Sequence, residues 1–264
     1  MTRPLLILFT LTLSFSAFSQ TKMFINKTNG TSDSLNISDI KSITFKTYSS
    51  SITNGLVAYY PFNGDATDAS GNGNNGTPSN CTPTTDRFGI SNRAFSFNGT
   101  SSSIVCANGQ SLQISADITV CAWIKTSTLP SSSKVVISKY DASDKGWLID
   151  TPNNSTGTVM FDGRDSTHTY RSSTGATRID DNKWHLVVGQ RQGTTWAIFV
   201  DTALSAQSNV NNGSSIQNSA PLTIGAQSSG AGSTWWNGLI DDVRIYNRAL
   251  SIDEIKALYH ENGW

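Results

Sequence analysis

Short apolar and aromatic runs recur along most of the chain, and turns rich in Gly, Ser and Asn separate them. In residues 118–125, Ile118, Val120, Ala122 and Ile124 share one face of an alternating pattern, which predicts a strand. Similar runs occupy residues 55–62, 93–99, 102–107, 134–140, 146–151, 158–163, 183–201, 221–226 and 238–246. Many short strands joined by such turns predict an all-β protein, built as a two-sheet antiparallel sandwich or jelly roll.

Two local patterns add detail to this fold. Gln192 and Gly193 separate two strand-like halves, which predicts a hairpin turn. Near the C-terminus, Ser251 is followed three residues later by Glu254, the spacing of a capping box. The apolar positions that follow lie on one face, so we expect one short helix over residues 251–260, packed on the sandwich.

The first 54 residues differ from the rest of the chain. Residues 1–19 combine one Arg, a short apolar run and small residues at the end, which predicts a secretory signal peptide. Because the apolar run is too short to span a membrane, we expect a soluble protein that is secreted, periplasmic or at the cell surface. Residues 20–54 predict a short hairpin-like module with a linker, and residues 55–264 predict one large domain. The short module resembles a segment that follows the signal peptide in secreted proteins of the Bacteroidetes.

Charge and cysteine content narrow the choice of partners. The chain carries 19 Lys and Arg against 19 Asp and Glu, and this zero net charge makes nucleic acid an unexpected partner. Three cysteines, Cys81, Cys106 and Cys121, allow one disulfide in an exported protein. The sequence leaves the pairing open, although Cys106 with Cys121 is favoured because both lie in strand-like runs. No Cys/His cluster is present, so zinc is not expected.

Four stretches together carry a family resemblance. They are residues 55–77, "GLVAYYPFNGDATDASGNGNNGT"; 95–105, "FSFNGTSSSIV"; 184–201, "WHLVVGQRQGTTWAIFVD"; and 238–259, "GLIDDVRIYNRALSIDEIKALY". In this order they resemble a laminin G-like (LamG-like) jelly-roll domain of the concanavalin A-like lectin/glucanase superfamily. The resemblance covers residues 55–262. It implies two packed sheets with the first and last strands side by side, a frequent structural calcium ion, and a role in binding, often of glycans.

The loop at residues 65–77 contains the oxygen ligands that calcium prefers. Asp68 and Asp65 supply carboxylates, and Asn72 supplies an amide oxygen, while the glycines allow a tight turn. The loop carries little charge for a strong site, so a distant carboxylate would help. The alternative is that these Asp and Asn side chains only accept hydrogen bonds from their own turn.

Asp241 is the distant carboxylate that we expect to join this loop. Strand alternation in residues 238–246 places Asp241 on the same face as Val243 and Ile245, which should be buried. A buried carboxylate needs a cation or several donors. The family resemblance implies that Asp68 and Asp241 hold its calcium ion. The alternative is an ion pair between Asp241 and a nearby Arg.

An enzymatic role is the less favoured interpretation of the sequence. Glycoside hydrolysis normally needs two carboxylic acids, and the only two glutamates, Glu254 and Glu261, belong to the C-terminal helix region. Three Asp pairs remain as candidates: Asp141 with Asp144, Asp162 with Asp165, and Asp180 with Asp181. Each lies in a turn-like context, where Asp is common for backbone reasons.

A glycan site would combine aromatic faces with polar groups at its rim. Trp235 follows a flexible polar loop, and Arg164, Tyr170 and Arg171 belong to another loop, so we expect these four residues to form a ligand-binding rim. Trp236, in contrast, should pack in the core. The alternative is an ordinary loop anchor beside a solvated turn.

The sequence thus predicts a secreted, non-catalytic module that binds carbohydrate and holds a structural calcium ion. A glycoside hydrolase or polysaccharide lyase with an Asp-based site is one alternative, and an extracellular protein-interaction module is another. The ligand and the oligomeric state stay open.

Overall fold

The computed structural model describes residues 22–26, 32–36, 39, 51–127, 132–141, 145–153, 156–167, 170–209, 214–228 and 234–264. The chain divides into two compact units, Met1–Thr47 and Tyr48–Trp264. In the first unit, β1 (Lys22–Asn26) and β2 (Ser32–Asn36) form an antiparallel pair. The predicted signal peptide lies outside the described residues, and the predicted boundaries at residues 19 and 54 stay predictions. No helix in the described ranges has the length and apolarity needed to cross a membrane.

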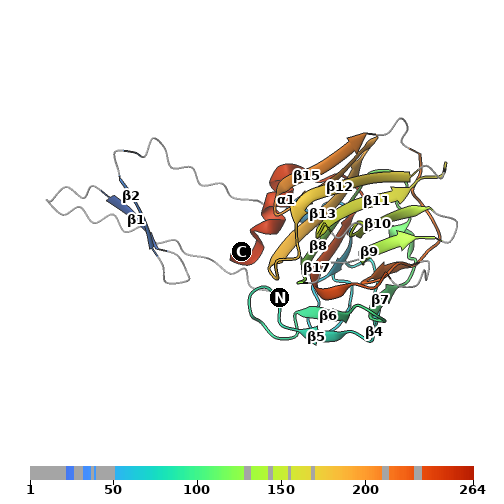
Figure 1. Ribbon diagram of the computed structural model, residues 1–264, viewed down its shortest axis with the longest axis horizontal. Coiled ribbons are helices and arrows are strands. Elements are labelled where there is room, and N and C mark those ends of the chain that lie inside the picture. The colour runs from blue at the N-terminus through green and yellow to red at the C-terminus, as the bar shows by residue number, and fades with distance from the viewer. Residues whose placement is uncertain are drawn as a thin grey trace. The chain divides into compact units, whose positions relative to one another are not determined.

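The second unit contains two antiparallel sheets, which form the two layers of a sandwich (Figure 1). The seven-stranded sheet has the order β12 (Tyr170–Arg178), β11 (Thr158–Arg164), β10 (Gly146–Asp150), β9 (Val135–Tyr140), β16 (Leu222–Ile224), β7 (Ser103–Cys106) and β4 (Gly76–Ser79). The eight-stranded sheet has the order β15 (Ala203–Asn209), β14 (Thr195–Val200), β13 (Trp184–Gln192), β8 (Ile118–Lys125), β17 (Asn237–Tyr246), β6 (Ala94–Asn98) and β5 (Thr82–Thr84), and β3 (Leu56–Tyr60) also pairs with β17. This arrangement confirms the predicted all-β jelly-roll sandwich.

Apolar side chains explain why the sheets pack against each other. One large cluster joins the inner faces of both sheets and includes Trp147 and Phe161 from one sheet and Ile124 from the other. A second cluster, with Trp123 and Leu258, lies between the outer face of the eight-stranded sheet and α1 (Ile252–Tyr259). The eight-stranded sheet is therefore buried on both faces near β8, whose two sets of side chains enter different clusters.

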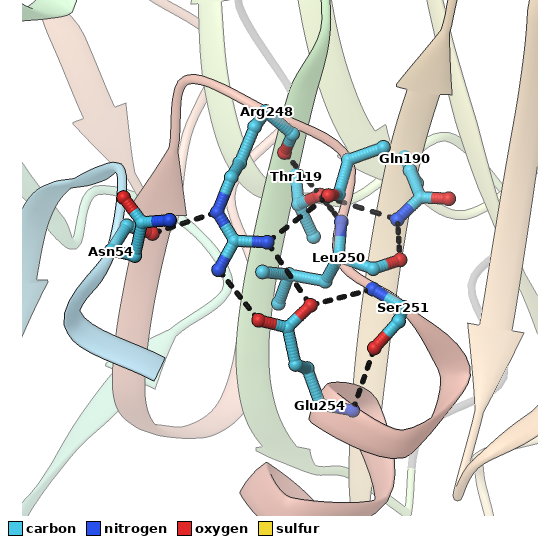
Figure 2. A network of polar contacts seen from close by, with 8 residues as sticks. Asn54, Thr119, Gln190, Arg248, Leu250, Ser251 and Glu254 are labelled. Carbon is cyan, nitrogen blue, oxygen red and sulfur yellow. Dashed lines mark hydrogen bonds and ion pairs between the residues drawn. The ribbon is translucent and has the colours of Figure 1, made fainter. Parts of the chain in front are cut away.

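The C-terminal helix begins with the predicted capping box (Figure 2). The Ser251 hydroxyl accepts a hydrogen bond from the Glu254 backbone N–H at 3.3 Å, and the Glu254 carboxylate accepts one from the Ser251 N–H at 2.8 Å. Arg248 pairs with the same carboxylate at 2.7 Å, and Gln190 donates to the Leu250 carbonyl oxygen at 2.8 Å. These contacts hold the start of α1 on strand β13.

The first and last strands of the sandwich are neighbours, as the family resemblance implies. Tyr246 of β17 pairs with Leu56 of β3, and Val243 pairs with Tyr60. The pairing of β17 with β8 shifts register between Asp241 and Arg244, which marks a β-bulge. This bulge decides where the predicted site residues of β17 point.

The predicted disulfide is wrong, because all three cysteines are free in the structure. Cys106 lies on β7 and faces the cluster between the sheets, whereas Cys121 lies on β8 in the cluster under α1. One layer of the sandwich therefore separates the two thiols that the sequence favoured as partners. Burial raises the pKa of each of these thiols to about 12, so both stay protonated and unreactive at neutral pH.

Candidate functional site

Asp68 organises the loop that follows β3. Its carboxylate accepts hydrogen bonds from the backbone N–H groups of Tyr59 (3.0 Å), Ser70 (2.9 Å) and Asn74 (2.9 Å). The Asn74 side-chain amide adds a fourth bond at 3.2 Å. Burial, the largest single influence, acts to raise the pKa of Asp68, but these hydrogen bonds together lower it below its usual value. Asp68 is therefore an ionised carboxylate whose two oxygens are both bound by N–H donors.

The other predicted ligands of this loop also bind the protein itself. Asp65 accepts from the Thr67 backbone N–H at 2.9 Å, and Asn72 donates to the Val57 carbonyl oxygen at 2.9 Å. Asp65 and Asn72 are exposed. These contacts match the alternative in which Asp and Asn side chains stabilise their own turn.

Asp241 does not share the face of Val243 and Ile245, so the alternation predicted for this strand is wrong. Ile240, Val243 and Ile245 all enter the cluster between the sheets. Ile240 and Val243 are three residues apart and still share a face, because the β-bulge adds one residue between them and Asp242 there adopts a φ of 46°. Asp241 therefore lies on the outer face, opposite Trp123 on β8.

A buried ion pair occupies this outer face. Arg87 Nη1 lies 2.8 Å from the Asp241 carboxylate and 2.7 Å from that of Asp242. The guanidinium also stacks on the Trp123 ring, 4.6 Å from its centroid, and on the Phe88 ring at 4.5 Å. One guanidinium group thus contacts two Asp side chains and lies against two aromatic rings.

The structure gives Asp68 and Asp241 separate partners, and none of these is shared. In the described ranges, no group of three or more His, Cys, Asp or Glu is placed to hold a metal ion. As placed, both carboxylates are bound by N–H donors and do not fit an ion shared between them. Calcium stays a prediction from the sequence.

The four predicted ligand residues do not come together. Trp235 is half-buried and its backbone bridges to Val135, at the start of β9. Arg164 and Tyr170 pair with each other at the opposite end of the same sheet, level with the last residue of β9. That end of β9 lies five residues, or roughly 17 Å along the strand, from Val135. Arg171 follows Tyr170 in β12, and the side chains of both lie outside the described part of the structure.

A polar hollow of about 620 Å³ opens elsewhere on the surface. Three chain segments line it: the stretch after β7, the β9–β10 turn and the stretch before β16. Its lining residues are Asn108, Gln110, Gln113, Asp141, Lys145, Ser215, Gln217, Asn218 and Ser219. We call this the amide hollow, because five of the nine lining residues carry amide side chains. The residues belong to unrelated polar loops, so no sequence pattern marks them as one site.

Three of these amides form a chain across the hollow. Gln217 Nε2 donates to Gln113 Oε1 at 3.2 Å, Gln113 Nε2 donates to Asn108 Oδ1, and Asn108 Nδ2 donates to the Ser219 carbonyl oxygen at 3.1 Å. A primary amide has two N–H donors and an oxygen with two lone pairs. The chain of amides uses only part of this capacity, so the side chains keep further donors and acceptors.

A buried lysine supports one wall of the amide hollow. Lys139 is 2% exposed, and its Nζ donates to the Asn218 carbonyl oxygen at 2.9 Å and to the Ala220 carbonyl oxygen at 3.1 Å. Asn218 Nδ2 in turn donates to the Lys139 carbonyl oxygen at 2.9 Å and to that of Lys145 at 3.1 Å. Burial lowers the pKa of Lys139 to about 8, against a smaller opposing effect of Asp141.

This lysine predicts a pH dependence of folding. Because the pKa of Lys139 is lower in the folded than in the unfolded chain, the unfolded chain binds more protons between about pH 8 and 10.5, and stability rises with pH there. We expect the unfolding free energy of the wild type, relative to that of Lys139→Met, to rise by about 1–3 kcal/mol between pH 7 and 10. Urea denaturation of both chains measures it, and a constant difference would contradict the assignment.

A second pair of carboxylates was missed by the sequence analysis. Asp150 on β10 and Asp162 on β11 lie diagonally on one face of the seven-stranded sheet, and they are 3% and 4% exposed. Asp150 also contacts the Ser133 hydroxyl at 2.5 Å. Burial, and then the charge of Asp162, raises the pKa of Asp150 well above its usual value. Twelve residues separate the two in sequence, so only the strand pairing brings them together.

Two of the Asp pairs that the sequence predicted, Asp180 with Asp181 and Asp141 with Asp144, are not seen as facing pairs in the described residues. Asp181 and Asp201 bind the two ring nitrogens of His185, at 3.0 and 2.6 Å. Asp180 pairs with Arg178 at 2.7 Å. Asp144, predicted as a partner of Asp141, lies outside the described residues.

A family model places the fold among known proteins. The model Laminin_G_3, described as the concanavalin A-like lectin/glucanases superfamily, matches residues 98–256. The chain belongs to this laminin G-like family. The match confirms the resemblance carried by the four sequence stretches, and it runs from the end of β6 to α1 of the LamG-like domain. No curated protein matches the chain.

Solved structures share the fold of the LamG-like domain at low sequence identity. The binding domain of Paraclostridial Mosquitocidal Protein 1 has a TM-score of 0.66 and 19% identity over 79% of this chain and 52% of its own. The receptor binding domain of botulinum neurotoxin D has a TM-score of 0.63 and 16% identity, over 80% of this chain and 53% of its own. The ligand binding domain of botulinum neurotoxin serotype D, in complex with N-acetylneuraminic acid, has a TM-score of 0.62 and 17% identity, over 80% of this chain and 52% of its own. The chain thus spans about half the length of these neighbours.

Proposed function

We propose that this LamG-like protein is a non-catalytic binding module, exported by its signal peptide, and that the amide hollow binds carbohydrate. The observation that carries the proposal is the chain of three amides across an open polar hollow. Sugar hydroxyls both donate and accept hydrogen bonds, and a primary amide has an oxygen to accept from them and N–H groups to donate to them. The hollow is large enough for more than one sugar ring.

The fold neighbours support a binding role. Each is described as a binding domain, and one was solved with N-acetylneuraminic acid, a sugar. The family description includes both lectins and glucanases, so family membership leaves open both a binding and a catalytic role. The amide hollow favours binding, because its chain of amides offers hydrogen bonds without a pair of facing carboxylates.

The buried carboxylates favour a second candidate, an Asp-based glycoside hydrolase or lyase. A raised pKa such as that of Asp150 suits a general acid, and Asp162 could act as its partner. Both side chains, however, are almost fully buried, and neither lines the amide hollow. A substrate would have to uncover them, so binding remains the proposal.

The test starts from a glycan array probed with the full chain. For any glycan that binds, we expect the double variant Gln113→Ala and Gln217→Ala to bind about tenfold more weakly, because two hydrogen-bonding amides are lost. Gln192→Ala is the matched control, since this exposed amide lies at the β13–β14 turn. Isothermal titration calorimetry compares the three chains.

Three outcomes would contradict the proposal. The first is equal affinity in the double variant and the control. The second is an array without binding glycans beside specific capture of a protein, which would favour the interaction module. The third is release of new reducing ends from a polysaccharide, lost in Asp150→Asn, which would favour the enzyme.

A further inference from the structure

Lys145 brings an ammonium group to the amide hollow. The residue lines the hollow and is half-buried. Its backbone closes the β9–β10 turn, because its N–H donates to the Asp141 carboxylate at 3.0 Å and its carbonyl oxygen accepts from the Asp141 N–H at 2.9 Å. In the part of the chain that the structure describes, its Nζ makes no hydrogen bond and no ion pair. The flexible stem therefore lets this ammonium group turn towards a ligand without breaking a protein contact.

A second positive charge lies behind the wall of the hollow. The three hydrogens of the Lys139 ammonium group point at the Asn218 carbonyl oxygen (2.9 Å), Asn218 Oδ1 (3.2 Å) and the Ala220 carbonyl oxygen (3.1 Å). None of these acceptors is a carboxylate, and Lys139 makes no ion pair with a described residue. Asn218 both holds this ammonium group and lines the hollow. Lys139 is too buried to touch a ligand, but its charge acts across a wall of low dielectric constant.

The charges around the hollow do not cancel. Asp141 carries the negative charge of the lining and Lys145 the positive one, while the other seven lining residues are neutral. Lys139 behind the wall adds a second positive charge. Buried charges are normally paired, so the Lys139 ammonium group favours an anion in the adjacent hollow. A group with one negative charge would balance the two lysines and Asp141.

The amides supply the remaining donors for such an anion. Gln113 and Gln217 each use one side-chain N–H in the chain of amides, and each amide nitrogen carries two. A carboxylate accepts from amide N–H groups and from ammonium groups alike, and such charge-assisted bonds are about twice as strong as neutral ones. A sugar that bears only hydroxyls gains no comparable bond from Lys145.

We propose that the amide hollow selects acidic sugars, with the sugar carboxylate beside the Lys145 ammonium group and the ring hydroxyls on the amides. The inference rests on the proposed carbohydrate binding and deepens it by naming the class of sugar. The carboxylate can belong to a hexuronic acid within a chain or to a sialic acid at its end. Both present the same group to Lys145.

Calorimetric titration of the full chain at low ionic strength tests this charge selection. The first arm compares a galacturonic acid trisaccharide with its methyl ester, which keeps the rings and hydroxyls and loses the charge. The second arm compares N-acetylneuraminic acid with its methyl ester. We expect the acid to bind at least tenfold more tightly than its ester in one arm, and that arm identifies the source of the carboxylate.

Lys145→Gln should weaken binding of the acid about tenfold and leave binding of the ester unchanged. The fold should survive, because the contacts of Lys145 in the turn come from its backbone. Lys145→Arg keeps the charge and should keep the preference for the acid. Lys183→Gln is the matched control, since this exposed lysine does not line the hollow.

Two results would overturn the inference. One is that neither acid binds more tightly than its ester. The other is a preference for the acid that Lys145→Gln leaves intact. If glycan binding still depends on Gln113 and Gln217 in either case, the proposed function stands and only the charge selection fails. If Lys145→Gln removes the preference while the double amide variant changes no affinity, the charge selection stands and the role of the amides fails.

Discussion

Replacing Arg87 by Met should lower the free energy of unfolding by about 3–5 kcal/mol, because it leaves the Asp242 carboxylate, next to Asp241, buried without its cation. The methionine fills most of the space between the Trp123 and Phe88 rings. The loss therefore reports mainly on charge. Chemical denaturation at pH 7 measures it.

Asp241→Asn is the matched variant on the other side of this pair. Burial, followed by the charge of Asp242, raises the pKa of Asp241 to about 8 against the opposing effect of Arg87. Asp241 is thus largely protonated at pH 7, and we expect Asn to cost less than about 1 kcal/mol. Equal losses in the Arg87 and Asp241 variants would contradict this distribution of charge.

The same pKa sets the direction of a pH effect. Because the folded chain keeps the Asp241 proton up to about pH 8 while the unfolded chain releases it near pH 4, the folded chain binds more protons in this window. The contribution of Asp241 to stability is therefore present below about pH 4 and declines towards pH 8. The decline should be absent in Asp241→Asn.

Replacing Asp68 by Ala should also be costly, at about 3–4 kcal/mol, because it removes the acceptor of one backbone N–H group in β3 and of two in the loop that follows it. Asp65→Ala is the control, since this exposed carboxylate accepts from Thr67 alone, and its loss should stay below about 1 kcal/mol. Thermal or urea unfolding of the full chain compares both variants.

Measuring these variants with calcium and with EDTA separates the turn from a metal site. The hydrogen bonds predict the same loss for Asp68→Ala in both buffers. A wild type that falls to the stability of Asp68→Ala only in EDTA would show instead that Asp68 acts through bound calcium. That result would confirm the calcium prediction and contradict the role derived from the hydrogen bonds.

Local patterns predicted the fold because they depend on neighbours in sequence. Alternation identified the strand at 118–125, Gln192 and Gly193 form the turn between β13 and β14, and the Ser251–Glu254 capping box starts α1. The family motifs added the pairing of the first and last strands. The strand, the turn and the capping box are each encoded within a short stretch of chain.

The site was harder to predict because it depends on register and on distant segments. A single inserted residue in β17 moved Asp241 to the outer face, and alternation alone does not reveal a bulge. Trp235 and Arg164 share a sheet but lie at opposite ends of it. The amide hollow and the Asp150–Asp162 pair form only after strands pair, so their sequences look like ordinary loops and strands.

The pairing of β3 with β17 has a mechanical consequence. Leu56 lies opposite Tyr246, so a force that pulls residue 55 away from residue 247 acts on both strands at the same end of their ladder. Such a load breaks their hydrogen bonds one after another, like a zipper, and not all at once in shear. Tension applied at this seam would therefore separate β3 from β17 first.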